Sequence, residues 1–63
     1  MLRVWRQIKT EFYGRMAYGS YFIEDAILKV KTPRGEKAAP LGAYRPDFLA
    51  ERLLRELAAE GKA

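Results

Sequence analysis

The sequence predicts an α+β fold, in which an antiparallel meander of three to four strands has one C-terminal amphipathic helix packed on one face. Three observations predict it: apolar and polar residues alternate near the N-terminus, a Pro-x-Gly turn lies in the middle, and an apolar stripe at helical spacing lies near the C-terminus. The 63 residues suffice for one small basic domain over 1–63. Residues 1–45 form the predicted sheet and residues 46–60 the predicted helix.

The first segment, from Leu2 to Phe12, alternates with a period of two and therefore predicts a strand with its even-numbered side chains inward. Arg6 interrupts the apolar side of this pattern. The alternative is a helix that gathers four large apolar side chains on one side: Leu2, Trp5, Ile8 and Phe12. The strand is the favoured interpretation, and Tyr13-Gly14-Arg15 then supplies a turn.

Two further segments have the composition of strands. Met16 to Ile23 is rich in aromatic residues, and Gly19 within it marks a bulge or a close approach of neighbouring atoms. The Glu24-Asp25 pair predicts either a tight turn or a kink in one long strand. The alternating segment from Ala26 to Thr32 then completes the third strand.

The segment Pro33-Arg34-Gly35-Glu36 is the clearest turn, because proline fixes φ at one position and glycine permits a positive φ at a later one. It leads into a short strand from Lys37 to Leu41. Pro40 has no backbone N–H to donate, so this strand lies at an edge of the sheet or ends there.

The predicted helix runs from Pro46 to about Ala59. Proline suits the first helical position, and Asp47 favours the positive end of the helix dipole. Gly61 is a fitting stop. The apolar stripe predicts that four side chains are buried against the sheet: Phe48, Leu49, Leu53 and Leu57.

Charge is divided unevenly along the chain. Residues 1–45 hold nine of the 12 Lys and Arg, four acids and seven of the eight aromatic residues, whereas residues 46–63 are slightly acidic. The net charge of +4 favours an anionic partner such as DNA or RNA. No stretch approaches the ~18 apolar residues of a membrane span, and no signal peptide is recognisable, so we expect no membrane association and a cytoplasmic location.

Catalytic chemistry is poorly supplied. The chain has no His and no Cys, which excludes disulfides, ordinary zinc sites and the usual proton-transfer and thiol groups. Ser20 is the only serine, and Glu24 and Asp25 would point to opposite faces of a strand. We therefore expect no enzyme, no catalytic residues, no cofactor and no metal.

Two clusters are candidates for contact with nucleic acid, because Arg and Lys bind phosphate, Gln reads adenine and Trp stacks on bases. In the strand interpretation the first projects from one face: Arg3, Trp5, Gln7 and Lys9. The second surrounds the Pro-x-Gly turn: Lys29, Lys31, Arg34 and Lys37. The alternative for Trp5 is a core position, and lysines near a sheet edge also prevent aggregation.

Aromatic residues near Arg15 form a third feature, and we expect at least half of them to be buried: Tyr13, Tyr18, Tyr21 and Phe22.

These observations lead to two hypotheses about the function of the protein. The first is a small non-enzymatic accessory protein that binds nucleic acid through a basic, aromatic sheet face. The alternative is a protein-interaction module, a homodimer or regulatory subunit, that binds no nucleic acid. A chain this small with no covalent or metal staple also predicts self-association.

Overall fold

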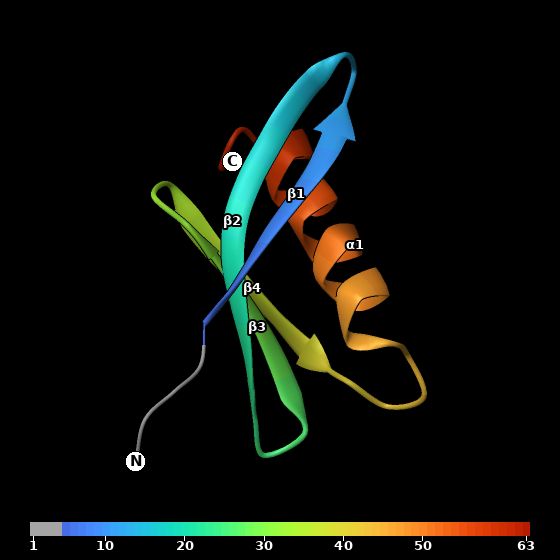
Figure 1. The fold of residues 1–63 in the computed structure, drawn as a ribbon. Coiled ribbons are helices and arrows are strands. Elements are labelled where there is room, and N and C mark those ends of the chain that lie inside the picture. The colour runs from blue at the N-terminus through green and yellow to red at the C-terminus, as the bar shows by residue number, and fades with distance from the viewer. Residues whose placement is uncertain (1–4) are drawn as a thin grey trace.

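A computed structural model describes residues 5–63 and confirms the α+β fold. Four strands form an antiparallel sheet in chain order: β1 (Arg6–Phe12), β2 (Arg15–Glu24), β3 (Ile27–Thr32) and β4 (Gly35–Pro40). The helix α1 (Pro46–Ala59) lies across one face and contacts all four strands (Figure 1). The expectations for Arg3 and for the beginning of the first strand lie outside the described residues.

β2 is the longest strand and joins two offset hairpins. It pairs with β1 between Arg15 and Tyr21, and with β3 between Ser20 and Glu24. Within the described residues, the part of β2 that precedes Ser20 therefore has a strand neighbour on the β1 side alone. This stagger leaves room beside the beginning of β2.

The first two hairpins close with two-residue turns in which both residues have positive φ. The values are 50° and 77° at Tyr13 and Gly14, and 52° and 62° at Asp25 and Ala26. Such turns match the right-handed twist of the flanking strands. The second of them settles the open alternative after β2, because the chain makes a tight turn there and does not continue as one kinked strand.

The β3–β4 turn lies within the predicted Pro33–Glu36 segment but is shorter: Pro33 and Arg34 form it, and β4 runs from Gly35 to Pro40 instead of the predicted Lys37 to Leu41. Gly35 does not adopt a positive φ. Its lack of a side chain matters for another reason, since a Cβ at Gly35 would lie 3.0 Å from Cδ of Lys62. The Thr32 hydroxyl accepts hydrogen bonds from the backbone N–H groups of Arg34 (3.2 Å) and Gly35 (3.1 Å). The turn therefore does not use the positive φ that glycine permits at this position.

The core lies between the sheet and one side of the helix. Its buried members from the strands and the helix are Ala17, Tyr21, Leu28, Val30, Leu49, Ala50, Leu53, Leu54 and Leu57. Gly19 allows the predicted close approach, and its pairing with Ile8 continues the regular register without a bulge. The predicted burial of Phe48 was wrong, because this side chain is 56% exposed. At ~100° per residue, Phe48 lies opposite the centre of the buried stripe.

The helix ends where the sequence predicts. Pro46 begins it, and Gly61 follows its end with φ of 74°. The backbone N–H groups of Gly61 and Lys62 donate to the carbonyls of Ala58 (3.0 Å) and Leu57 (2.8 Å), which satisfies groups left free by the last turn. No helix in residues 5–63 is long and apolar enough to span a membrane.

Candidate nucleic-acid interface

The helix covers one face of the sheet, and we call the other the open face. Thr10 accepts a hydrogen bond from Arg55 of the helix (3.2 Å), so the odd-numbered side chains of β1 point away from the helix. The strand register extends this assignment across the sheet. The open face comprises Trp5, Gln7, Lys9, Glu11, Met16, Tyr18, Ser20, Phe22, Glu24, Ile27, Lys29, Lys31, Glu36, Ala38 and Pro40.

The structure brings together much of the predicted site but divides the second cluster. Lys29 and Lys31 share the open face with the predicted residues Trp5, Gln7 and Lys9. Arg34 is exposed in the β3–β4 turn.

Lys37 lies on the helix side of β4, where its Nζ is 3.1 Å from Oε1 of Glu56 and also pairs with Glu60. Hydrogen bonding, to Glu60 first and then to Glu56, raises the pKa of Lys37 above its usual value. Lys37 therefore does not join the other lysines on one surface.

Charge on the open face is more balanced than the sequence suggests. Besides its three lysines this face contains Glu11, Glu24 and Glu36, and Nζ of Lys29 lies 3.9 Å from Oε1 of Glu36. Lys9 and Lys31 make no ion pair with any residue in 5–63. The cationic character of this face is therefore local, centred on Lys9 and Lys31.

Trp5 is both a packing residue and an exposed one. Its ring meets that of Phe22 edge to face, with 4.4 Å between centroids, and Phe22 is only 8% exposed although the helix does not cover it. Trp5 itself remains 41% exposed. The sequence left core and surface open as alternatives, and the ring serves in both ways.

Tyr18 presents the most accessible ring on the open face. It is 62% exposed and stands directly opposite Lys9 in the β1–β2 register. Two residues further along β2, and on the same face, Ser20 lies between Gln7 of β1 and Lys31 of β3. An exposed ring next to an unpaired ammonium group offers both stacking and phosphate attraction.

A hollow of about 440 Å³ lies beside Trp5, lined by Trp5, Ser20, Lys31, Thr32 and Pro33. We call it the tryptophan hollow. An aromatic ring, a hydroxyl and an ammonium group border one open space there, which suits a planar ring with polar edges. The sequence did not single out Ser20 or Pro33 for this surface. Strand register could have placed Ser20 here, because a β1–β2 pairing that sets Gln7 opposite Ser20 puts both side chains on the same face of the sheet.

No cluster of three or more potential metal-binding side chains occurs within residues 5–63. A comparison of the chain with protein-family models, with curated proteins and with solved structures finds no match in any of the three.

Proposed function

We propose that this chain is a small, non-enzymatic, cytoplasmic accessory protein that binds nucleic acid, DNA or RNA, through the open face of its sheet. One observation supports this function best. Trp5 and Tyr18 expose aromatic rings on the same face as Lys9 and Lys31, whose ammonium groups have no ion pair within residues 5–63.

In this mechanism the rings supply affinity and the lysines supply attraction to the backbone. Stacking of a base on an aromatic ring contributes about 1–3 kcal/mol and tolerates any base, because each base has a π face. Each lysine that neutralises a phosphate releases a counterion, so binding weakens as salt rises. Gln7 and Ser20, which are neighbours across β1 and β2, supply polar contacts to base edges.

Tyr18→Ala provides the sharpest test, because the Tyr18 ring is largely exposed and its loss should leave the fold intact. Trp5→Ala is less suitable, since it also removes the packing partner of Phe22. We expect Tyr18→Ala to weaken binding to single-stranded DNA or RNA by about 5- to 150-fold, the loss of one stacked base. Tyr44→Ala is the matched control, since this exposed tyrosine lies in the loop before α1 and should bind as wild type does.

Salt dependence provides the second measurement. Binding should weaken steeply between about 50 and 200 mM salt if phosphate contacts dominate. If neither DNA nor RNA binds below ~100 µM in ~50 mM salt, which is weaker than most non-specific binding, the proposed function fails.

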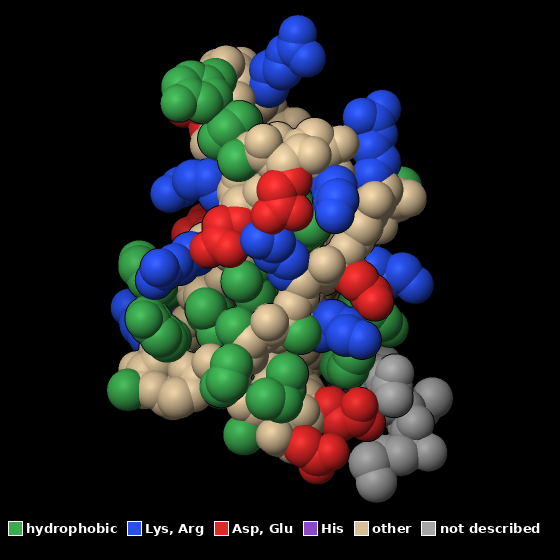
Figure 2. All heavy atoms as spheres, turned by 180° about the vertical axis from the view of Figure 1, so that it is seen from behind, with side chains coloured by type: hydrophobic (Ala, Val, Ile, Leu, Met, Phe, Trp, Pro, Cys, Tyr) green, Lys and Arg blue, Asp and Glu red, His purple; other side chains and the backbone are tan. Residues whose placement is uncertain are grey.

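A different surface favours the second candidate function, a protein-interaction module. Tyr44 and Phe48 are exposed and stacked, with 6.3 Å between centroids and 8° between planes. They lie beside a groove of about 690 Å³ between β4 and α1, whose apolar lining includes Pro40, Leu49 and Leu53. Hydrophobic side chains gather in the lower half of the molecule seen from behind (Figure 2).

Aromatic side chains of this kind anchor protein interfaces. If this second function holds, sedimentation should give a mass above the 7.3 kDa of one chain, and Phe48→Ser should restore the mass of one chain. A wild-type mass of 7.3 kDa at micromolar concentration would exclude the homodimer.

A further inference from the structure

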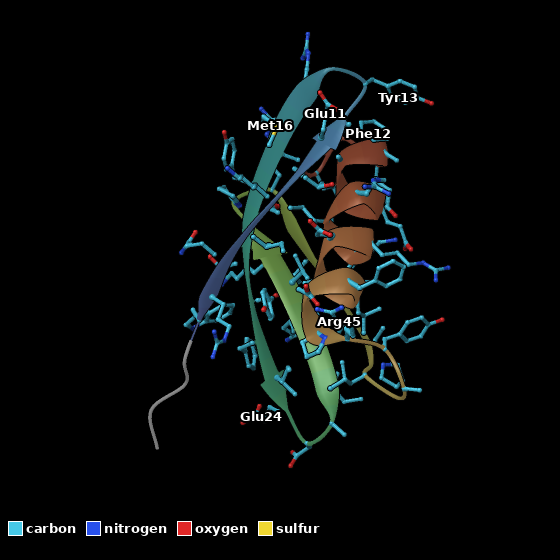
Figure 3. The ribbon with its side chains drawn as sticks, turned by 45° about the vertical axis from the view of Figure 1, so that its right-hand side comes forward. Glu11, Phe12, Tyr13, Met16, Glu24 and Arg45 are labelled. Carbon is cyan, nitrogen blue, oxygen red and sulfur yellow. The ribbon has the colours of Figure 1, made fainter. Side chains whose placement is uncertain are left out.

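A second hollow of about 660 Å³ lies outside the open face, between the β1–β2 hairpin, the β3–β4 turn and the C-terminal end of α1. Its lining includes Phe12, Tyr13, Arg15, Met16, Pro33 and Arg34. It occupies the space that the staggered pairing leaves beside the beginning of β2. Figure 3 shows three of these side chains, Phe12, Tyr13 and Met16, around the hairpin. We call it the arginine hollow.

Both charged side chains that line the arginine hollow are positive, and Ala63 also lines it. Arg15 and Arg34 border it, and no Asp or Glu side chain does. Neither arginine makes an ion pair with a carboxylate of residues 5–63. A guanidinium group presents a planar fork of donors that matches the oxygens of a phosphate. Two such groups on separate elements, β2 and the β3–β4 turn, therefore favour an anionic ligand between them.

The arginine hollow adjoins the proposed binding face at Pro33, which also lines the tryptophan hollow. Along β2, the open-face side chains pass from Ser20 in one hollow, through Tyr18, to Met16 in the other. At ~3.3 Å per strand residue, Ser20 and Met16 are about 13 Å apart.

This distance limits the length of strand that would connect the hollows. At the ~3.4 Å rise per nucleotide of a stacked strand, 13 Å corresponds to about four nucleotide steps. An unstacked strand is more extended and covers the same distance in fewer steps, so a strand of at most about five nucleotides connects the two hollows.

We propose that the arginine hollow holds a backbone phosphate of a single-stranded nucleic acid whose bases contact Tyr18 and the tryptophan hollow. This inference rests on the proposed function and specifies its substrate class. A duplex keeps the faces of its bases stacked on one another, whereas the hollow beside Trp5 and the ring of Tyr18 require a base whose face is free. The ligand is therefore unpaired over the few nucleotides that connect the two hollows.

The test measures fluorescence anisotropy of labelled oligothymidylates of three to twelve nucleotides and of a twelve-base-pair duplex. Arg15→Gln and Arg34→Gln should each weaken binding of the single strand about tenfold or more, as expected for a lost charge-assisted hydrogen bond. Each should also lower the slope of log affinity against log salt by about 0.7.

Arg45→Gln is the control for net charge. It removes the same charge near the beginning of α1, far from the arginine hollow (Figure 3), and should change affinity less than about twofold. Circular dichroism checks that each variant folds. Arg15→Lys and Arg34→Lys provide a second pair that keeps the charge but loses the fork, and their affinity should fall between wild type and the glutamine variants.

The outcomes separate the two proposals. If both glutamine variants bind as Arg45→Gln does while Tyr18→Ala binds weakly, the phosphate site is wrong and the proposed function stands. A duplex that binds as tightly as the single strand overturns the single-strand inference alone. An acidic peptide such as polyglutamate that binds through Arg15 and Arg34 when oligonucleotides do not would overturn both and support a protein partner.

Discussion

Leu54 of the helix packs directly against the backbone of Gly19 in β2. A Cβ at Gly19 would lie 3.2 Å from Cδ1 of Leu54 and 3.1 Å from the carbonyl oxygen of Lys31. Leu54 is fully buried in the core between the helix and the sheet. The missing side chain at position 19 thus sets how closely the helix approaches the sheet.

Gly19→Ala should therefore destabilise the fold by about 1–3 kcal/mol, since the backbone oxygen of Lys31 cannot yield as a side chain would. Urea unfolding measures the change. Ser20→Ala, a small change at a half-buried neighbour on the open face, is the control and should cost under about 0.5 kcal/mol. A Gly19→Ala variant as stable as the control would show that the helix can move outward without loss.

The buried helix stripe gives a second prediction. Leu53→Ala should cost about 2–5 kcal/mol, because it removes a buried side chain and leaves a cavity between helix and sheet. Phe48→Ala, at the exposed position opposite the stripe, should cost far less in the same denaturant series. Equal losses at Leu53 and Phe48 would contradict the observed orientation of the helix.

A substitution in the β2–β3 turn is predicted to increase the stability of the fold. Ala26 has φ of 62°, a left-handed conformation that costs an L-residue with a Cβ about 1 kcal/mol or more. Ala26→Gly should thus stabilise the protein by up to about 1 kcal/mol and produce the Asp-Gly pair that such turns favour. Ala38→Gly in the exposed part of β4 is the contrast and should destabilise by about 0.5–1 kcal/mol. Thermal melts of the two variants should move in opposite directions.

Thr32 joins the β3–β4 turn to the end of the chain. Besides accepting from Arg34 and Gly35, its hydroxyl hydrogen-bonds the carbonyl oxygen of Lys62. Thr32→Val keeps the shape of this buried side chain but leaves those groups without a partner, so we expect a loss of about 1–3 kcal/mol. Thr32→Ser keeps the hydroxyl and should recover most of the loss in calorimetry.

The pairing of Lys37 with Glu60 predicts a pH window. Hydrogen bonding to Lys37 lowers the pKa of Glu60 below 4.5, so its stabilisation is present above pH 4.5 and is lost as pH falls through the lowered value. The pKa of Lys37 is raised above 10.5, so its stabilisation is present below pH 10.5 and is lost as pH rises through the raised value.

The difference in unfolding free energy between wild type and Lys37→Met should therefore be largest between the lowered pKa of Glu60 and the raised pKa of Lys37. It should become smaller at lower and at higher pH. It should also shrink in salt, because the pair is exposed to solvent. In Lys37→Arg the stabilisation should still be lost at the same acidic pH, but it should persist to higher pH, since arginine stays charged. A difference that is constant across pH would show that the pair contributes nothing.

Local signals in the sequence predicted the elements well. Pro46 and Gly61 bound the helix as expected, and the alternation through Ile8, Thr10 and Phe12 faces the helix as the strand interpretation requires. These features depend on neighbouring residues alone. The prediction for Phe48 was wrong because apolar character alone does not give the face of a helix, and Phe48 lies opposite the centre of the buried stripe.

The candidate site was harder to predict because it depends on register. Lys37 looks like a neighbour of Lys31 in sequence, yet it falls on the opposite face and pairs with acids of the helix. Arg15 and Arg34 are distant in sequence, and the stagger of β2 brings both to one hollow. Composition along the chain cannot reveal either relationship, since a shift of one residue exchanges the two faces of a strand.

The stagger of β2 also bears on how the molecule unfolds. Within the described residues, only Ser20 and Tyr21 of β2 have strand neighbours on both sides. The β1–β2 hairpin and the β2–β3–β4 part of the sheet are thus held together over a very short overlap, and the helix bridges them by contacting every strand. Neither hairpin can separate without exposing the apolar side of the helix that covers both. We therefore expect one all-or-none transition, with the slowest amide hydrogen exchange at this crossing of the two hairpins.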